Sequence, residues 1–222
     1  MARSQHYVRR RSDAVAAACG LAVLGLGMLA VREGSVSDVE EGAFRGVNDL
    51  PGFLYPLLWP VQQLGVIVVG PIVAVVALVA RKPRLAIAAV IVTVLKLLSE
   101  RGVKALVSRQ RPGTSIGDIH ARGDVSLGGE SFVSGHAVLA AALACVIAPY
   151  LSGRWRLVPW VLIGLVAFGR VYVGAHNPLD VICGAGLGVA IGSGLNLILG
   201  VPAPSDESEP TATPSEVPTS PT

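Results

Sequence analysis

Charged residues are scarce in this 222-residue sequence: they make up 15% of it, whereas a soluble domain typically has about 25%. Hydrophobic residues make up 52%, which excludes a disordered chain and indicates that lipid surrounds much of the protein. The net charge is only +3, and no basic run interleaved with aromatic residues is present. We therefore expect no nucleic-acid partner.

Cysteine and lysine are also rare. The three cysteines, Cys19, Cys145 and Cys183, lie in apolar stretches, and their number is odd. This excludes a disulfide framework and a cysteine metal site, and we interpret them as small buried hydrophobic residues. Three lysines stand against fifteen arginines, and alanine, valine and glycine are abundant, a composition typical of high-GC bacteria.

Long apolar runs dominate the rest of the sequence, and a transmembrane helix needs about 20 mostly apolar residues, with roughly 17 as a floor. The candidate runs are residues 14–31, 61–80, 85–98 (continuing as helix to about 107), 136–151, 157–173 and 178–199. They predict an all-α polytopic membrane protein with six transmembrane helices in a bundle. The first run could also be a signal peptide, but it lacks a clear cleavage site, and we interpret it as an uncleaved anchor.

Three short connections are basic and fall on one side of a six-helix arrangement. They are the N-terminal segment with Arg9 to Arg11, the turn at residues 81–84, and the connection with Arg154 and Arg156. The positive-inside rule places that side in the cytoplasm. Six basic residues from the end of the third run to the start of the fourth oppose this orientation: Lys96, Arg101, Lys104, Arg109, Arg111 and Arg122. We expect a basic cytoplasmic N-terminus (1–13), a membrane domain (14–200) and a disordered Pro/Ser/Thr/Glu-rich tail (201–222).

Polar residues near three of the predicted helix ends form clusters on the other side. In the first cluster Lys104 and Arg111 are two helical turns apart, so both cations are expected on one helix face that ends at Pro112. Such a pair can hold a multiply charged anion. The alternative is a pair of interfacial cations whose charges snorkel to water.

The second cluster is Ser134-Gly135-His136, directly before an apolar run. Ser134 is suited to cap the helix, and Gly135 lets an anion approach the free N–H groups at its N-terminus. His136 could then protonate a leaving oxygen. The alternative is a histidine with a structural role only.

The third cluster contains Arg170, His176 and Asp180, with Asn177 and Pro178 favouring a helix start between the last two. Asp180 in the first turn can reach back to His176, fix its tautomer and leave the other ring nitrogen as a nucleophile. Arg170 adds a further cation. The alternative is an ordinary capped helix.

Together, Lys-x6-Arg-Pro, Ser-Gly-His and Arg-x5-His-x3-Asp resemble the signature of the type 2 phosphatidic acid phosphatase (PAP2) superfamily, over about residues 14–199. Val133 and Gly169 depart from the family pattern, which usually has Pro and Ser there. The resemblance implies that His176 attacks phosphorus, that Asp180 orients it and that His136 is the acid and base. It implies phosphate binding by a further set of residues: Lys104, Arg111, Ser134, Gly135 and Arg170.

The resemblance also implies a membrane lipid phosphatase in the inner (plasma) membrane, with its active site near the extracytoplasmic interface. We expect a lipid phosphate substrate, first a polyprenyl carrier lipid, and no cofactor or metal. The alternatives are a general glycerolipid phosphatase, acting on phosphatidic acid or phosphatidylglycerol phosphate, then a lipid-to-sugar phosphotransferase, then a transporter. His120 is interpreted as a solvated loop residue, and Glu100 and Arg101 as an interfacial pair.

Overall fold

The computed structural model describes residues 6–123 and 125–203, which are almost entirely helical. The α-helices are α1 (Arg11–Ala30), α2 (Asp38–Asn48), α3 (Tyr55–Gln62), α4 (Val69–Val79), α5 (Pro83–Leu106), α6 (Pro112–Ser115), α7 (Gly135–Ile147), α8 (Val158–Tyr172) and α9 (Pro178–Leu199). The 3₁₀ turns are η1 (Gly52–Leu54), η2 (Gln63–Gly65), η3 (Ala148–Tyr150) and η4 (Gly153–Leu157). Two short strands, β1 (Tyr7–Val8) and β2 (Val201–Pro202), complete the described elements.

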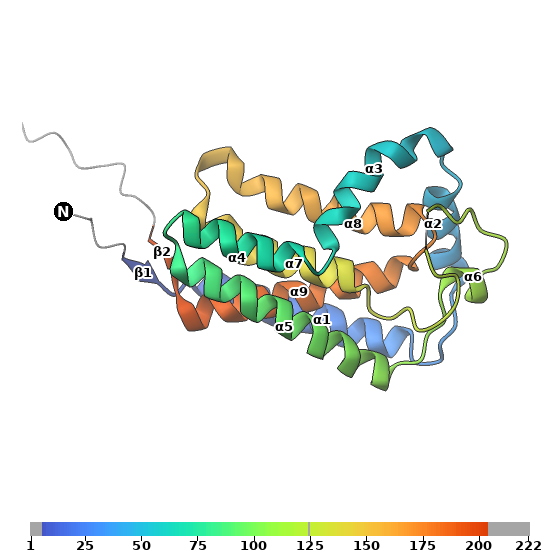
Figure 1. The fold of residues 1–222 in the computed structure, drawn as a ribbon. Helices are drawn as coiled ribbons and strands as arrows, with labels where there is room; N and C mark the ends of the chain where they lie inside the picture. Colours follow the sequence, from blue (N-terminus) through green and yellow to red (C-terminus); the bar gives the residue numbers. More distant parts are fainter. Residues whose placement is uncertain (1–5, 124, 204–222) are drawn as a thin grey trace, which may run out of the picture.

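The long helices run side by side in a bundle, with α7 among them (Figure 1). Helix α7 packs against α5, α8 and α9, and its residues from Ala137 to Val146 are nearly all buried. Close packing depends on glycine: a Cβ added to Gly192 of α9 would lie 2.6 Å from the backbone oxygen of Ala142. Small residues bring helix backbones together in this way in membrane proteins.

Three helical stretches are long and apolar enough to span a membrane: α1, η4 with α8, and α9. A fourth is possible if the bent pair 52–65 and 69–79 counts as one span. Helix α5 is long enough but carries charges at Lys96, Glu100 and Lys104, and α7 is shorter. All six predicted runs contain helix, and the count of six spans stays a prediction.

The second run, 61–80, is not one helix as predicted. Helix α3 passes into the turn η2, the chain extends at Val66, and α4 starts at Val69 with a bend of 69°. The turn lies against α7, since a Cβ on Gly65 would be 2.6 Å from that of His136. The residues on both sides of the break are apolar, and the polar pair Gln62 and Gln63, at the end of α3 and the start of η2, lies between them.

The two ends of the described chain meet at the left of Figure 1. Strand β1 pairs antiparallel with β2, and Val201 is buried. The predicted unpacked tail is therefore wrong for residues 201 and 202, because pairing with the N-terminal segment satisfies their backbone groups. Residues 204–222 lie outside the described residues. Arg84 stacks on Tyr7 at this end and donates to the Leu199 carbonyl.

Candidate active site

The three predicted clusters meet at the opposite end of the bundle, where α2, α6 and the long 107–134 connection lie (Figure 1). The first turns of α7 and α9 and the last turn of α8 come together there. Helices α7 and α9 are held in register at this end by the Ser134 N–H, which donates to the Asp180 carbonyl at 3.0 Å. The second and third clusters are therefore joined through backbone.

His176 lies in the connection between α8 and α9 and is 3% exposed. Its Nδ1 is 3.7 Å from Asp180 Oδ2 and 3.4 Å from Ser131 Oγ. Asp180 also accepts hydrogen bonds from Ser131 Oγ and from the Asn177 backbone N–H, the latter at 2.8 Å. The contacts to the ring thus use Nδ1, which leaves Nε2 as the nitrogen available for attack.

Burial and the neighbouring charges change the pKa of His176 in opposite directions. Burial lowers the pKa of His176 below its usual value, Asp180 raises it, and Arg170 and Arg111 lower it further. The net effect is a lowered pKa, so the imidazole is neutral near pH 7. A neutral imidazole is the form that can act as a nucleophile.

Behind Asp180 lies Arg109, a fully buried residue whose site role the sequence did not reveal. Its Nη1 donates to Asp180 Oδ1 at 2.9 Å and to Glu40 Oε1 at 3.1 Å, and its Nη2 donates to Glu40 Oε2. Burial opposes the charge of Arg109, but its bonds to the two carboxylates outweigh burial and raise its pKa. The array Glu40–Arg109–Asp180–His176 therefore runs from α2 to the proposed nucleophile.

A pocket of about 390 Å³ brings Arg111, His136 and Arg170 together. Arg111 is anchored by its Nη1, which donates to the Ala175 carbonyl at 3.1 Å. Burial lowers the pKa of Arg111, an effect that Asp180 and Glu100 oppose. Residues Tyr55, Trp59 and Gln62 of α3 form the opposite wall. Two guanidinium groups and an imidazole facing one space are suited to a phosphate group.

Ser134 holds the N-cap position of α7, but its hydroxyl makes no cap hydrogen bond. Within residues 6–123 and 125–203, the Ser134 Oγ has no hydrogen-bond partner although it is buried. Gly135 follows, and a Cβ there would collide with the Glu100 carboxylate. The Glu100 carboxylate thus lies in the space that a side chain at position 135 would occupy. The binding of a substrate anion at Gly135 stays a prediction.

Lys104 is not among the residues that line the pocket. Its Nζ pairs with Glu100 at 2.7 Å, and Glu100 pairs equally with Lys96. The prediction that Lys104 and Arg111 share one helix face is wrong, because α5 ends at Leu106 and Val107 is extended. Glu100 pairs with these lysines, whereas we had expected a pair with Arg101.

The loop residue His120 is exposed, and its Nε2 lies 3.7 Å from Asp49 Oδ1. Its backbone N–H donates to Asn48, and Arg122 stacks on Tyr172 nearby, so this connection is held by structural contacts. In the described part of the chain, no group of three or more His, Cys, Asp or Glu residues could hold a metal ion.

Known proteins with similar sequence or structure were then compared with the chain. The model of the PAP2 superfamily matches residues 84–200, which include every predicted site residue. A search of curated proteins found no match. The crystal structure of Aquifex aeolicus LpxE aligns with a TM-score of 0.66 and 21% identity, covering 72% of this chain and 98% of that one.

A second similar structure is that of the first transmembrane PAP2 type phosphatidylglycerolphosphate phosphatase from Bacillus subtilis. It aligns with a TM-score of 0.64 and 20% identity, covering 80% of this chain and 94% of that one. These likenesses establish a shared fold. With the family match over more than half of its length, the chain belongs to the PAP2 superfamily.

Proposed function

We propose that this protein is a membrane phosphatase that hydrolyses the phosphomonoester or diphosphate of a lipid through a phosphohistidine intermediate. The observation that carries the proposal is the buried array that ends at His176 beside a pocket with Arg111, His136 and Arg170. The buried array supplies an oriented nucleophile, His176. The pocket supplies two cations, Arg111 and Arg170, and an acid, His136. Both are needed for phosphoryl transfer.

In the proposed reaction, His176 Nε2 forms a bond to phosphorus while the bond from phosphorus to the leaving oxygen breaks. The Asp180 carboxylate, 3.7 Å from Nδ1, balances the positive charge that develops on the ring. His136 donates its proton to the leaving oxygen. Water then attacks the phosphohistidine, His136 takes the proton from that water, and inorganic phosphate and free His176 result.

The phosphate oxygens would be held by Arg111, Arg170, the Ser134 hydroxyl and the Gly135 N–H. Charge builds up on these oxygens in the transition state, and fixed donors stabilise it there more than in the ground state. Lys104 would join them once its pairing with Glu100 is exchanged for the substrate. No metal is assigned a role in this scheme.

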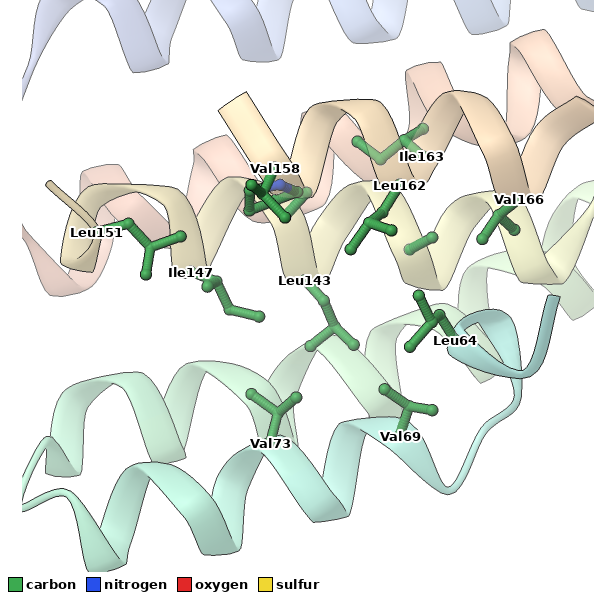
Figure 2. Close-up of a pocket in the computed structure, with 13 residues that line it drawn as sticks. Leu64, Val69, Val73, Leu143, Ile147, Leu151, Val158, Leu162, Ile163 and Val166 are labelled. Carbon is green, nitrogen blue, oxygen red and sulfur yellow. The ribbon is translucent and has the colours of Figure 1, made fainter. Parts of the chain in front are cut away.

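An apolar groove supports a lipid as the substrate (Figure 2). It lies between α4, α7 and α8, where Leu143 and Ile147 face Val69 and Val73 in Figure 2. Ala140 and Val166 line this groove, and each lies four residues, or about one helical turn, from a pocket residue, His136 and Arg170 respectively. A phosphate in the pocket would place its hydrocarbon chain in the groove.

Among lipid phosphates, a polyprenyl carrier lipid is our first choice, on the composition of the sequence. A glycerolipid phosphate is the alternative, and the phosphatidylglycerolphosphate phosphatase that shares the fold supports it. We place a lipid-to-sugar phosphotransferase and a transporter below both. The array around His176 argues against a transporter, because transport needs no nucleophile.

The test measures phosphate release from a panel of purified lipid phosphates in detergent, with and without excess EDTA. We expect release that EDTA does not reduce, fastest with polyprenyl substrates. His176→Ala should abolish it, and the control His120→Ala, in the exposed loop, should not. His136→Ala should retain slow formation of a phosphoenzyme when the leaving group is good. Labelled phosphate on His136 instead of His176 would contradict the assignment.

A further inference from the structure

Gln62, the last residue of α3, contacts the site from outside the three predicted clusters. It is 4% exposed, and its Oε1 accepts a hydrogen bond from Arg170 Nη1 at 3.2 Å. Arg170 has a further buried donor, Nε, with no hydrogen-bond partner in the described part of the chain. Gln62 is therefore the one side chain there that is seen to hold this guanidinium by a hydrogen bond.

Gln62 also fills the space next to Gly169. A Cβ on Gly169 would lie 2.8 Å from the Gln62 Cγ and 3.2 Å from its Cδ, closer than carbon atoms pack. The residue before Arg170 is thus a glycine where a side chain from α3 lies. Gln62 can take this position only because residue 169 has no side chain.

The hydrogen bond between Arg170 and Gln62 determines the orientation of the Gln62 amide. A guanidinium only donates, so the amide oxygen must face Arg170. The amide –NH₂ group is then the other end of a side chain that lines the same pocket as Arg111 and His136. It is a donor in a place where cations already favour an anion.

We propose that Gln62 is a substrate-binding residue that holds Arg170 in place and donates a hydrogen bond from its Nε2 to a phosphate oxygen. It thereby supplies the donor that position 169, as glycine, lacks. This inference rests on the proposed function, since it names a further ligand of the same phosphate. The segment that follows contributes too, because Gly65 in η2 lies directly against His136.

The experiment compares Gln62→Ala, Gln62→Glu, Gly169→Ser and the double variant Gln62→Ala/Gly169→Ser. The matched control is Gly164→Ser, also on α8, where an added Cβ meets nothing within 4 Å. Inorganic phosphate is the probe: its binding is measured by the rise that it causes in the melting temperature of each purified variant. Phosphate release from the best lipid substrate gives kcat and KM.

Loss of one hydrogen bond to a charged group corresponds to about 10- to 100-fold in affinity, and we expect Gln62→Ala to weaken phosphate binding and kcat/KM by that factor. Gln62→Glu keeps the oxygen for Arg170 but loses the donor, so it should fold normally and bind phosphate at least as poorly. Phosphate binding by Gln62→Glu equal to that of the wild type would overturn the proposal.

The effect of Gly169→Ser should change sign with its background. In the wild-type background, the added serine displaces Gln62, and kcat/KM should fall. In the Gln62→Ala background, the serine enters the space that Gln62 leaves, and kcat/KM should rise. The same effect in both backgrounds would also overturn the proposal. A wild type that binds phosphate through Gln62 but hydrolyses no lipid phosphate would contradict the proposed function alone.

Discussion

Arg109 is fully buried, and two carboxylates neutralise its charge. A buried ion pair gives little net stability, but removal of one partner leaves a charge in the interior without compensation. Arg109 bridges α2 and α9 as well, because Glu40 also accepts the Leu179 N–H at 2.9 Å. It therefore fixes both the fold at this end and the position of Asp180.

We expect Arg109→Met to lower the free energy of unfolding by about 3–5 kcal/mol, because Glu40 and Asp180 are left unpaired in the interior. Denaturant unfolding in detergent micelles measures it. Arg101→Met removes an exposed arginine from α5 and serves as the control, with an expected change within about 0.5 kcal/mol. A change of that small size for Arg109→Met would contradict the interpretation of the array.

The residues of the array show what sequence reasoning could reach. His176 and Asp180 were found because they are four residues apart and flank a helix start. Arg109 was counted only as one basic residue in a long connection, and Glu40 as part of an acidic stretch. They lie 69 positions apart, and no local pattern pairs residues at such a separation. Gln62 was missed because it lay within a predicted span.

At the scale of elements, helix α5 carries a ladder of charges, Lys96–Glu100–Lys104, one turn apart each. The Glu100 carboxylate neutralises the lysines and lies against Gly135, where an anion would bind. In the proposed reaction a substrate phosphate would compete with this carboxylate for Lys104.

Glu100→Gln should lower the KM for a lipid phosphate about 2- to 10-fold, because the amide keeps the shape but no longer competes for the lysines. A steady-state titration at low ionic strength measures it. Lys104→Met is the complementary change and should raise KM. An unchanged KM in Glu100→Gln would show that Lys104 takes no part in binding phosphate.

The close contact between α7 and α9 leads to a prediction about stability. Gly192→Ala should cost about 1–3 kcal/mol, because its Cβ would meet the backbone of α7. Gly194→Ala, two residues along the same helix, meets nothing within 4 Å and should be neutral or slightly stabilising. Thermal unfolding of the two variants in one detergent gives the difference. Equal melting temperatures would contradict the close approach of these helices.

Elements differ in how well the sequence predicted them. Helices α1, α5, α8 and α9 begin and end within a few residues of their apolar runs, because composition changes at their ends. The break after α3 was missed because Leu64, Gly65 and Val66 are all compatible with a span. At the break the η2 turn lies against His136, a contact between residues far apart in the sequence that no local pattern reveals.

On the scale of the whole molecule, basic residues occur at both ends of the bundle, in different states. At the end opposite the site, Lys82 lies over the ring of Tyr150, and Arg84 stacks on Tyr7 and donates to the Leu199 carbonyl. Arg10 at this end pairs with Asp13. At the site end, Lys96, Lys104 and Arg109 are paired with carboxylates. Arg122 donates to four backbone carbonyls, those of Asn48, Leu50, His120 and Tyr172.

We therefore expect the site to face away from the cytoplasm. Residues 114 and 152 are exposed at opposite ends of the bundle, so Thr114→Cys and Ser152→Cys are suitable probes once the native cysteines are replaced. In intact cells an impermeant maleimide should label position 114 and not position 152. The reverse labelling pattern would place the site in the cytoplasm.

The pairing of β1 with β2 has a consequence for how the chain can be connected. The Ala203 N–H donates to the His6 carbonyl at 2.9 Å, so the two ends of the described chain are neighbours. A short linker could join them, and the chain could be opened instead at Ser152, an exposed residue just after η3, which contacts β2. Such a circular permutant would begin with η4 and α8, keep every helix in its original direction and bring both new termini out at the end away from the site.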